Sequence, residues 1–282
     1  MHPIQLLISS LLFLSLFENS LAAHSSHQEE KGTILVTCAT GELGSTIAKL
    51  LGEDYHLILA GRDSLKLLQL KESLHKDSYK CETLLLDYSN YASIENFRKD
   101  RAKNPCPIKG VVLITPRPFF GKDLLQSEEN WLNLFQTTFT GPLEVLKSTL
   151  PYLSSGSKVV VIAGTTSVQL QPEYGPACVI RRMWTTYCKA LSHHLGPKGI
   201  HVNVISPGVV LTNFHRERID KKAKEIGGNF EEELAKDAAN IPLQRHARPL
   251  EIAKSIRFLL SEDSNFITGM NLVIDGGKTV SY

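Results

Sequence analysis

A short turn with two glycines joins the first apolar run of the chain to its first helical pattern. Residues 33–38 read TILVTC, a β-branched run typical of a buried strand, and Gly41-Glu42-Leu43-Gly44 follows. Glycines at such a junction let the backbone approach a pyrophosphate closely, at the positive end of the helix. The turn therefore predicts a dinucleotide site; a tight turn without a ligand is the alternative.

Metal and thiol chemistry finds little support in the sequence. The five cysteines form no C-x-x-C pair and have no zinc-ligand spacing, and an odd number cannot all pair. We expect them to be buried thiols. His193-His194 has no acid at a matching spacing and predicts a solvated helix end. No metal site is expected.

Strand and helix patterns alternate from residue 32 onward. Strand-like runs lie at 33–38, 55–60, 83–87, 110–114, 158–163, 201–206 and 269–277, and helical patterns lie at 64–74, 93–103, 128–150, 177–195 and 252–260. Alternation at this spacing predicts a parallel sheet with helices on both faces. Residues 32–282 are therefore expected to form one α/β domain, a doubly wound, Rossmann-like sheet with three α/β/α layers.

The charged segment 211–240 interrupts this alternation. Gly227-Gly228 separates two helical stretches within it. In a doubly wound fold this segment leaves the carboxyl end of a strand, where ligands bind. A helical lid and a solvated surface hairpin are the two interpretations.

Composition and the first residues bear on partners and compartment. Lys+Arg is 31 and Asp+Glu is 29 in 282 residues, a net charge of +2, so no nucleic-acid partner is expected. Residues 3–17 are mostly apolar and small residues follow. Residues 1–23 therefore predict a signal peptide and 24–31 a linker, with export to a periplasmic or secretory compartment. A cytoplasmic protein is the alternative, and no stable membrane span is expected after cleavage.

The C-terminal third resembles the short-chain dehydrogenase/reductase family, and within it the 3-oxoacyl-carrier-protein reductases. Asn203-Val-Ile-Ser-Pro207-Gly208-Val-Val-Leu-Thr212 matches the family pattern N-x-x-x-P-G-x-x-x-T. Ile241-Pro-Leu-Gln-Arg245, Pro249-Leu-Glu-Ile252 and 267–277 match its tail. The resemblance covers about 250 residues. It implies a homodimer or homotetramer, with the helices near 128–150 and 177–195 at the interface.

The resemblance also implies an NADP(H) site. Arg62 matches the arginine that pairs with the 2′-phosphate, and Asp87 matches the acceptor at the adenine edge. Two glycines of the family turn are replaced, by Cys38 and by Glu42, whose carboxylate would repel a phosphate. The implied cofactor-binding residues are Thr37, Thr40, Gly41, Leu43, Gly44, Arg62, Asp87, Tyr88, Thr115, Arg181, Pro207, Gly208, Val209 and Thr212.

The family's catalytic tetrad is replaced at every position. Gapless counting from Asn203 puts Arg181 in place of the lysine, Ala177 in place of the tyrosine and Gly164 in place of the serine. Thr138 stands at the asparagine position. Alanine and glycine can neither donate a proton nor hold an oxyanion, and arginine keeps its proton near neutral pH.

A displaced catalytic set is still conceivable in the same segments. Tyr174 precedes Ala177 by three residues and Thr165 follows Gly164, so Tyr174, Arg181 and Thr165 are the candidate catalytic residues. The sequence predicts an NADP(H)-type oxidoreductase with weak or remodelled activity on a small-molecule or acyl substrate. The alternatives are a non-catalytic binding or scaffold protein, exported as a pseudoenzyme, and an enzyme of another class that uses Tyr174 and Arg181 without hydride transfer.

Overall fold

A computed structural model describes residues 32–118 and 123–280. The predicted signal peptide, 1–23, and linker, 24–31, lie outside these residues. Within them, no helix combines the length and the apolar character that crossing a bilayer requires. The residues from Gly32 onward form one compact unit.

The described residues form a seven-stranded, all-parallel sheet in the order β3-β2-β1-β4-β5-β6-β7. The predicted doubly wound sheet is therefore confirmed. The chain reverses its direction of travel across the sheet between β1 and β4, which places a crevice at the carboxyl ends of these strands. The strands are β1 (Thr33–Val36), β2 (His56–Gly61), β3 (Cys81–Leu85), β4 (Ile108–Ile114), β5 (Leu153–Ile162), β6 (His201–Pro207) and β7 (Asn271–Ile274).

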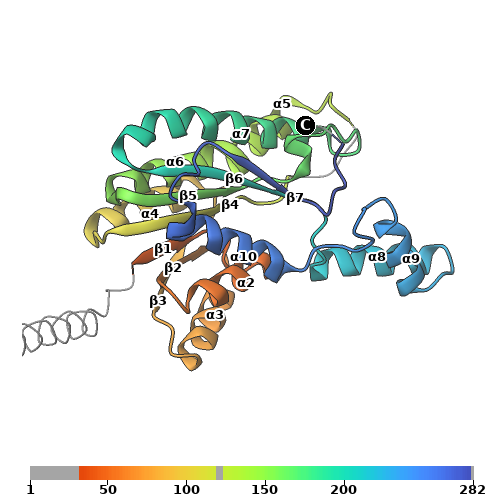
Figure 1. Cartoon of the computed structure of the whole chain (residues 1–282), viewed down its shortest axis with the longest axis horizontal. Helices are drawn as coiled ribbons and strands as arrows, with labels where there is room; N and C mark the ends of the chain where they lie inside the picture. Colours follow the sequence, from red (N-terminus) through yellow and green to blue (C-terminus); the bar gives the residue numbers. More distant parts are fainter. Residues whose placement is uncertain (1–31, 119–122, 281–282) are drawn as a thin grey trace, which may run out of the picture. The chain divides into compact units, whose positions relative to one another are not determined.

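Helices cover both faces of the sheet and give it two separate cores (Figure 1). Successive strand residues point to opposite faces, so Leu35 packs in one core while Ile34 and Val36 pack in the other. Both faces are buried, which explains the unbroken apolar strands. One face carries α4 (Tyr91–Lys103), α5 (Glu128–Phe135), α6 (Gly141–Thr149) and α7 (Gly175–Leu195), and the other carries α2 (Glu42–Leu51), α3 (Ser64–Lys76) and α10 (Pro249–Leu260).

The helix expected over 128–150 contains a π-helical turn, η1 (Gln136–Thr140), between α5 and α6. The amide of Gly141 donates to the carbonyl of Gln136, five residues earlier. A Cβ at Gly141 would lie 2.7 Å from that carbonyl oxygen, so the wide turn needs a glycine there. The irregularity thus lies directly before Gly141-Pro142 and includes Thr138.

The segment 211–240 contains the two predicted helices, α8 (Asn213–Glu225) and α9 (Phe230–Ala238). The chain turns between them at Gly227, which has φ +67°. Figure 1 shows this hairpin beyond the carboxyl ends of the strands. A bridge between Val210 and Ala247 joins the two ends of the hairpin. This bridge holds the base of the hairpin next to the crevice.

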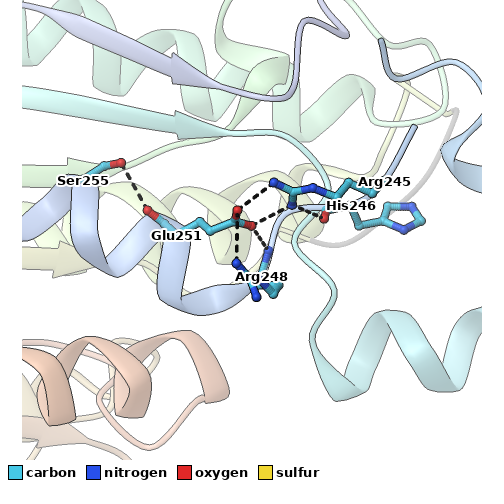
Figure 2. Close-up of polar contacts among 5 residues, drawn as sticks. All are labelled: Arg245, His246, Arg248, Glu251 and Ser255. Carbon is cyan, nitrogen blue, oxygen red and sulfur yellow. Dashed lines mark hydrogen bonds and ion pairs between the residues drawn. The ribbon is translucent and has the colours of Figure 1, made fainter. Parts of the chain in front are cut away.

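An ion pair fixes the return from the hairpin into α10 (Figure 2). Arg245 donates two hydrogen bonds to the carboxylate of Glu251, at 2.8 and 2.7 Å, and the amide of Arg248 donates to the same carboxylate at 2.8 Å. These bonds hold the pKa of Glu251 at about 2, mainly through Arg245. The tail motif that carries the family resemblance therefore caps α10.

The contact between β1 and α2 generates a stability prediction. A Cβ at Gly44 would collide with the carbonyl of Cys38 and lie 2.9 Å from Cα of Ala39, both backbone atoms. Gly44→Ala should therefore lower the free energy of unfolding by about 1–3 kcal/mol, measured by urea denaturation. Gly196→Ala is the matched control, because nothing lies within 4 Å of its added Cβ. Equal stability of the two variants would contradict this account of the turn.

Candidate functional site

The predicted cofactor turn has the backbone of a glycine-rich turn. Cys38, at the first replaced glycine, adopts φ +47°, a left-handed conformation that favours glycine. Burial raises the pKa of the Cys38 thiol to about 12. The thiol is therefore protonated near neutral pH and is not a nucleophile. The turn therefore has the backbone conformation that glycine favours, at a position that holds Cys38.

Glu42 joins this turn to the hairpin. Glu42 is the first residue of α2, and its Oε2 accepts a hydrogen bond of 2.5 Å from the amide of Asn213, the first residue of α8. The carboxylate thus lies at the positive end of α8. The Glu42 carboxylate therefore occupies the Asn213 amide, a donor that could otherwise bind a phosphate.

The residue before Asn213 has a buried hydroxyl without a hydrogen-bond partner among the described residues. The hydroxyl oxygen of Thr212, which precedes Asn213, is buried and accepts or donates no hydrogen bond within the described residues. An unpaired buried hydroxyl costs about 1–3 kcal/mol. A ligand that bonded to the Thr212 hydroxyl would remove that cost, so this hydroxyl is a candidate ligand contact.

Arg62 and Asp87 lie at the ends of the two strands beyond β1. Arg62 is exposed, and it forms no ion pair with any residue the structure describes. Asp87 accepts two hydrogen bonds from Ser89, at 2.9 and 2.7 Å, and these together with Arg62 lower its pKa. Asn90, not Asp87, caps α4. Asp87 therefore does not cap this helix.

Two of the predicted cofactor residues have structural roles. Thr37 Oγ1 donates to the carbonyl of Ile114 and accepts from its amide, both at 2.8 Å, which ties the ends of β1 and β4 together. The ring of Tyr88 is 3% exposed and belongs to the core. The Thr37 hydroxyl and the Tyr88 ring thus serve the fold.

The remaining predicted cofactor residues lie at the same edge of the sheet. Pro207 ends β6, and a Cβ at Gly208 would lie 2.8 Å from Cβ of Asp275. Gly208 thus permits the close approach of the chain after β6 to the segment after β7. The others are half-buried or exposed at strand or helix ends: Thr40, Gly41, Leu43, Thr115 and Val209.

The residues expected at the tetrad positions are buried or half-buried. Gly164 has φ +144°, and a Cβ there would lie 2.9 Å from Cζ of Arg181. The guanidinium therefore fills the space that a serine side chain would need. Ala177 is 1% exposed and has no proton to donate. The carbonyl of Thr138 accepts from the indole of Trp184 at 2.8 Å, which occupies that carbonyl.

The three predicted catalytic residues do not form one hydrogen-bonded set. Arg181 donates to Thr166 at 2.9 Å, whereas Thr165 accepts from Gln171 at 3.5 Å. Arg181 thus bonds to Thr166, which neighbours the predicted Thr165 in the short helix at 165–167. Tyr174 accepts from Nη1 of Arg218 at 3.2 Å.

Arg218 is a residue that the sequence reasoning missed. It lies in α8, 44 positions after Tyr174, and no local pattern links the two. Finding Arg218 would have required the position of the hairpin in space. Arg117, after β4, was not singled out either; its Cζ lies 3.6 Å from the ring centroid of Phe214.

The electrostatics of this region are those of a partly dehydrated cationic cleft. Burial, and then the positive charge of Arg117, lower the pKa of Arg181 to about 10. Burial, Arg218 and Arg117 lower the pKa of His215 to about 4, so its imidazole is neutral at pH 7. The cleft therefore offers a tyrosine hydroxyl, a neutral imidazole and fixed guanidinium charges. Among the described residues, no cluster of metal-ligating side chains is present.

Comparisons with known proteins agree with this geometry. The model of the family described as Enoyl-(Acyl carrier protein) reductase matches residues 42–279. A mouse protein, dehydrogenase/reductase SDR family member 4, is 26% identical over 247 residues, which cover 86% of this chain and 85% of the mouse protein.

Solved structures share the fold. L-sorbose reductase from Gluconobacter frateurii, complexed with NADPH and L-sorbose, has a TM-score of 0.84 at 19% identity and covers 90% of this chain and 98% of its own. An NADPH-bound short-chain oxidoreductase from Pseudomonas aeruginosa PAO1 that contains an atypical catalytic center has a TM-score of 0.79 at 20% identity, with coverages of 89% and 98%.

The family match spans most of the chain, and the sheet order and the strand-to-helix turn agree with it. The protein therefore belongs to the short-chain dehydrogenase/reductase family.

Proposed function

We propose that the protein is an NADP(H)-type reductase in which Tyr174, instead of the residue at the family's tyrosine position, supplies the proton. The observation that carries this proposal is the hydrogen bond of 3.2 Å between the Tyr174 hydroxyl and Arg218, in the same crevice as Arg181. The family position itself holds Ala177, which has no exchangeable proton.

The residues present fit NADP(H) in three respects. Arg62 is an exposed guanidinium at the end of β2, suited to a 2′-phosphate. The unpaired hydroxyl of Thr212 needs a partner, and Cys38 keeps the glycine-like turn. The NADPH in the two similar solved structures supports the same ligand here. Bound NADPH would supply a hydride to a carbonyl carbon.

The chain's own residues would serve the other half of the reduction. A carbonyl oxygen that gains negative charge needs a proton and a nearby positive charge. Tyr174 can donate the proton, and Arg218 and Arg181 can stabilise the charge that its oxygen then carries. The route differs from the family's, because Gly164 offers no hydroxyl and Thr138 has its carbonyl bonded to Trp184.

A non-catalytic binding protein is the second candidate, and the contact between Glu42 and Asn213 favours it. That contact ties the cofactor turn to the hairpin with a negative charge, which opposes a pyrophosphate. Export through residues 1–23, which we propose on sequence alone, would also remove the chain from the reduced dinucleotides of the cytosol. The activity of the wild-type protein decides between the two candidates.

We also propose that two or four copies associate through α7 and the helix region α5–η1–α6. A largely apolar groove on this face is lined by Phe139, Val179, Met183, Tyr187 and Ala190, among others. Exposed apolar grooves of this kind are typical of protein interfaces. The family resemblance, which implies the same helices, supports a second copy as the occupant.

Replacement of Tyr174 tests the proton donor. In Tyr174→Phe, NADPH oxidation with a ketone substrate should fall about 10²–10⁴-fold, because a general acid contributes that factor. Tyr91→Phe, at a side chain that is 69% exposed, is the control and should be unaffected. The rate of NADPH oxidation at saturating NADPH is measured for both variants. Identical background rates in wild type and both variants would favour the binding protein.

Replacement of Glu42 tests the cofactor turn. Wild-type protein should gain little melting temperature from NADPH, whereas Glu42→Gln and Glu42→Gly should bind NADPH at least about fivefold more tightly, since the repulsion removed is on the order of 1 kcal/mol or more. Titration calorimetry and thermal shift provide the measurement. Equal affinity of all three proteins would mean that Glu42 does not oppose the cofactor.

A charge in the apolar groove tests the assembly. Met183→Lys should shift the protein to smaller species in sedimentation velocity, because a lysine would be buried without a partner at the interface. Leu65→Lys, at an exposed position on the opposite face, is the control. A wild-type protein that stays monomeric at tens of micromolar would overturn the proposed interface.

A further inference from the structure

Four polar side chains from four segments form a continuous series of contacts that ends at Tyr174. The His246 imidazole donates through Nε2 to Oδ2 of Asp237 at 2.8 Å, because a carboxylate can only accept. The other oxygen of Asp237, Oδ1, lies 3.6 Å from Nη2 of Arg218. Nη1 of Arg218 donates to the Tyr174 hydroxyl at 3.2 Å. Asp237 and Arg218 thus each hold a neighbour on either side.

The main chain at His246 is fixed on both sides. Arg245 donates to the carbonyl of His246 at 3.1 Å and also holds the Glu251 carboxylate of α10. The amide of the next residue, Ala247, donates to the carbonyl of Val209 at 3.0 Å, before the hairpin begins. Figure 2 shows the His246 ring pointing away from the Arg245–Glu251 pair. Because His246 is only 5% exposed, packing fixes its ring, and the ring can orient Asp237.

Asp237 transmits this fixed position to Arg218. Asp237 lies in the last turn of α9, and its two carboxylate oxygens face two different partners. The Arg218 side chain is 40% exposed, so many rotamers are open to it unless a partner holds it. A guanidinium is planar, with its donors in a fixed fork, so a contact at Nη2 also orients Nη1. The direction in which Nη1 points therefore depends on the Asp237 carboxylate.

Other contacts hold the two helices of the hairpin together. The Lys222 ammonium of α8 pairs with the buried Glu233 carboxylate of α9. Apolar side chains of both helices are buried as well. The packing of α8 on α9 therefore has support apart from the contact between Asp237 and Arg218. A positioning role for Asp237 can thus be separated from a purely structural one.

We propose that Asp237 and His246 are positioning residues that hold the Arg218 guanidinium against the Tyr174 hydroxyl. This deepens the proposed function, on which it rests for the role of Tyr174 as proton donor. When the hydroxyl gives its proton to a carbonyl oxygen, a phenolate remains until solvent returns a proton. A guanidinium held at a fixed distance stabilises that phenolate, whereas a freely rotating one does so only part of the time.

The first test observes the Tyr174 ring and needs no catalysis. The full chain is labelled with 3-fluorotyrosine at all eight tyrosines, and the fluorine resonance that disappears in Tyr174→Phe is assigned to this residue. Arg218→Gln should shift the resonance. Asp237→Asn should shift it in the same direction, because an amide has no charge to hold the guanidinium, although it can still accept from His246. An unchanged resonance in either variant would overturn the proposal.

His246 is tested by loss and by rescue. His246→Leu removes the donor to Asp237 and should shift the Tyr174 resonance. His246→Gln should return the resonance most of the way to its wild-type position, because the amide nitrogen of glutamine can donate at a similar reach. An unshifted resonance in His246→Leu would overturn the role of His246, and so would a glutamine variant that behaves like the leucine variant.

Lys222→Gln is the matched control, because it breaks the ion pair with Glu233 between the same two helices. It should leave the Tyr174 resonance at its wild-type position. A shift equal to that of Asp237→Asn would mean that any loosening of the hairpin moves Tyr174, which would overturn a specific role for Asp237. Circular dichroism establishes that each variant folds. If Asp237→Asn does not fold, Asp237→Glu, which keeps the charge and displaces it by one methylene, should shift the resonance in its place.

Kinetics separates this proposal from the function on which it rests. With a ketone substrate at saturating NADPH, Asp237→Asn should lower kcat at least about tenfold and change the KM of the ketone less than about twofold, whereas Lys222→Gln should keep the wild-type kcat. A wild-type kcat in Asp237→Asn would overturn the positioning role and leave the reductase function intact. If wild-type protein does not oxidise NADPH while the fluorine shifts occur as expected, the positioning contacts stand and the reductase function fails.

Discussion

The packing of the Arg181 guanidinium against Gly164 is the contact on which the local structure after β5 depends. Gly164 has φ +144° and cannot carry a side chain without displacing the guanidinium. A serine at position 164 and this position of Arg181 therefore exclude each other. Arg181 donates to Thr166, and burial lowers the pKa of its guanidinium to about 10.

The hairpin of α8 and α9 connects the two halves of the crevice. Its first amide, on Asn213, binds the Glu42 carboxylate of the cofactor turn, and Arg218, one and a half turns further along, binds the Tyr174 hydroxyl. The bridge between Val210 and Ala247 and the pair between Arg245 and Glu251 anchor both ends of this hairpin to the sheet. One helix, α8, therefore contacts both the strand-to-helix turn and Tyr174.

Glu42 and the arginines are two departures with opposite charge in neighbouring parts of one crevice. A carboxylate would repel a dinucleotide phosphate, and the guanidinium groups carry the opposite charge. Both charges are fixed by contacts with the chain: Glu42 with Asn213, Arg181 with Thr166. The sheet order is that of a doubly wound fold, whereas these two charged contacts are particular to this chain.

The sequence by itself determined the parallel sheet and the helical layers on its two faces, because apolar strand patterns and helical periodicity are local properties. The two helices within 211–240 were predicted in the same way. Tertiary structure alone decided the partners. Arg218 meets Tyr174 across 44 residues, Glu42 meets Asn213 across 171, and Arg181 chooses Thr166 over Thr165. Such pairings depend on how a hairpin and a short turn pack in space, which no periodicity or spacing along the chain encodes.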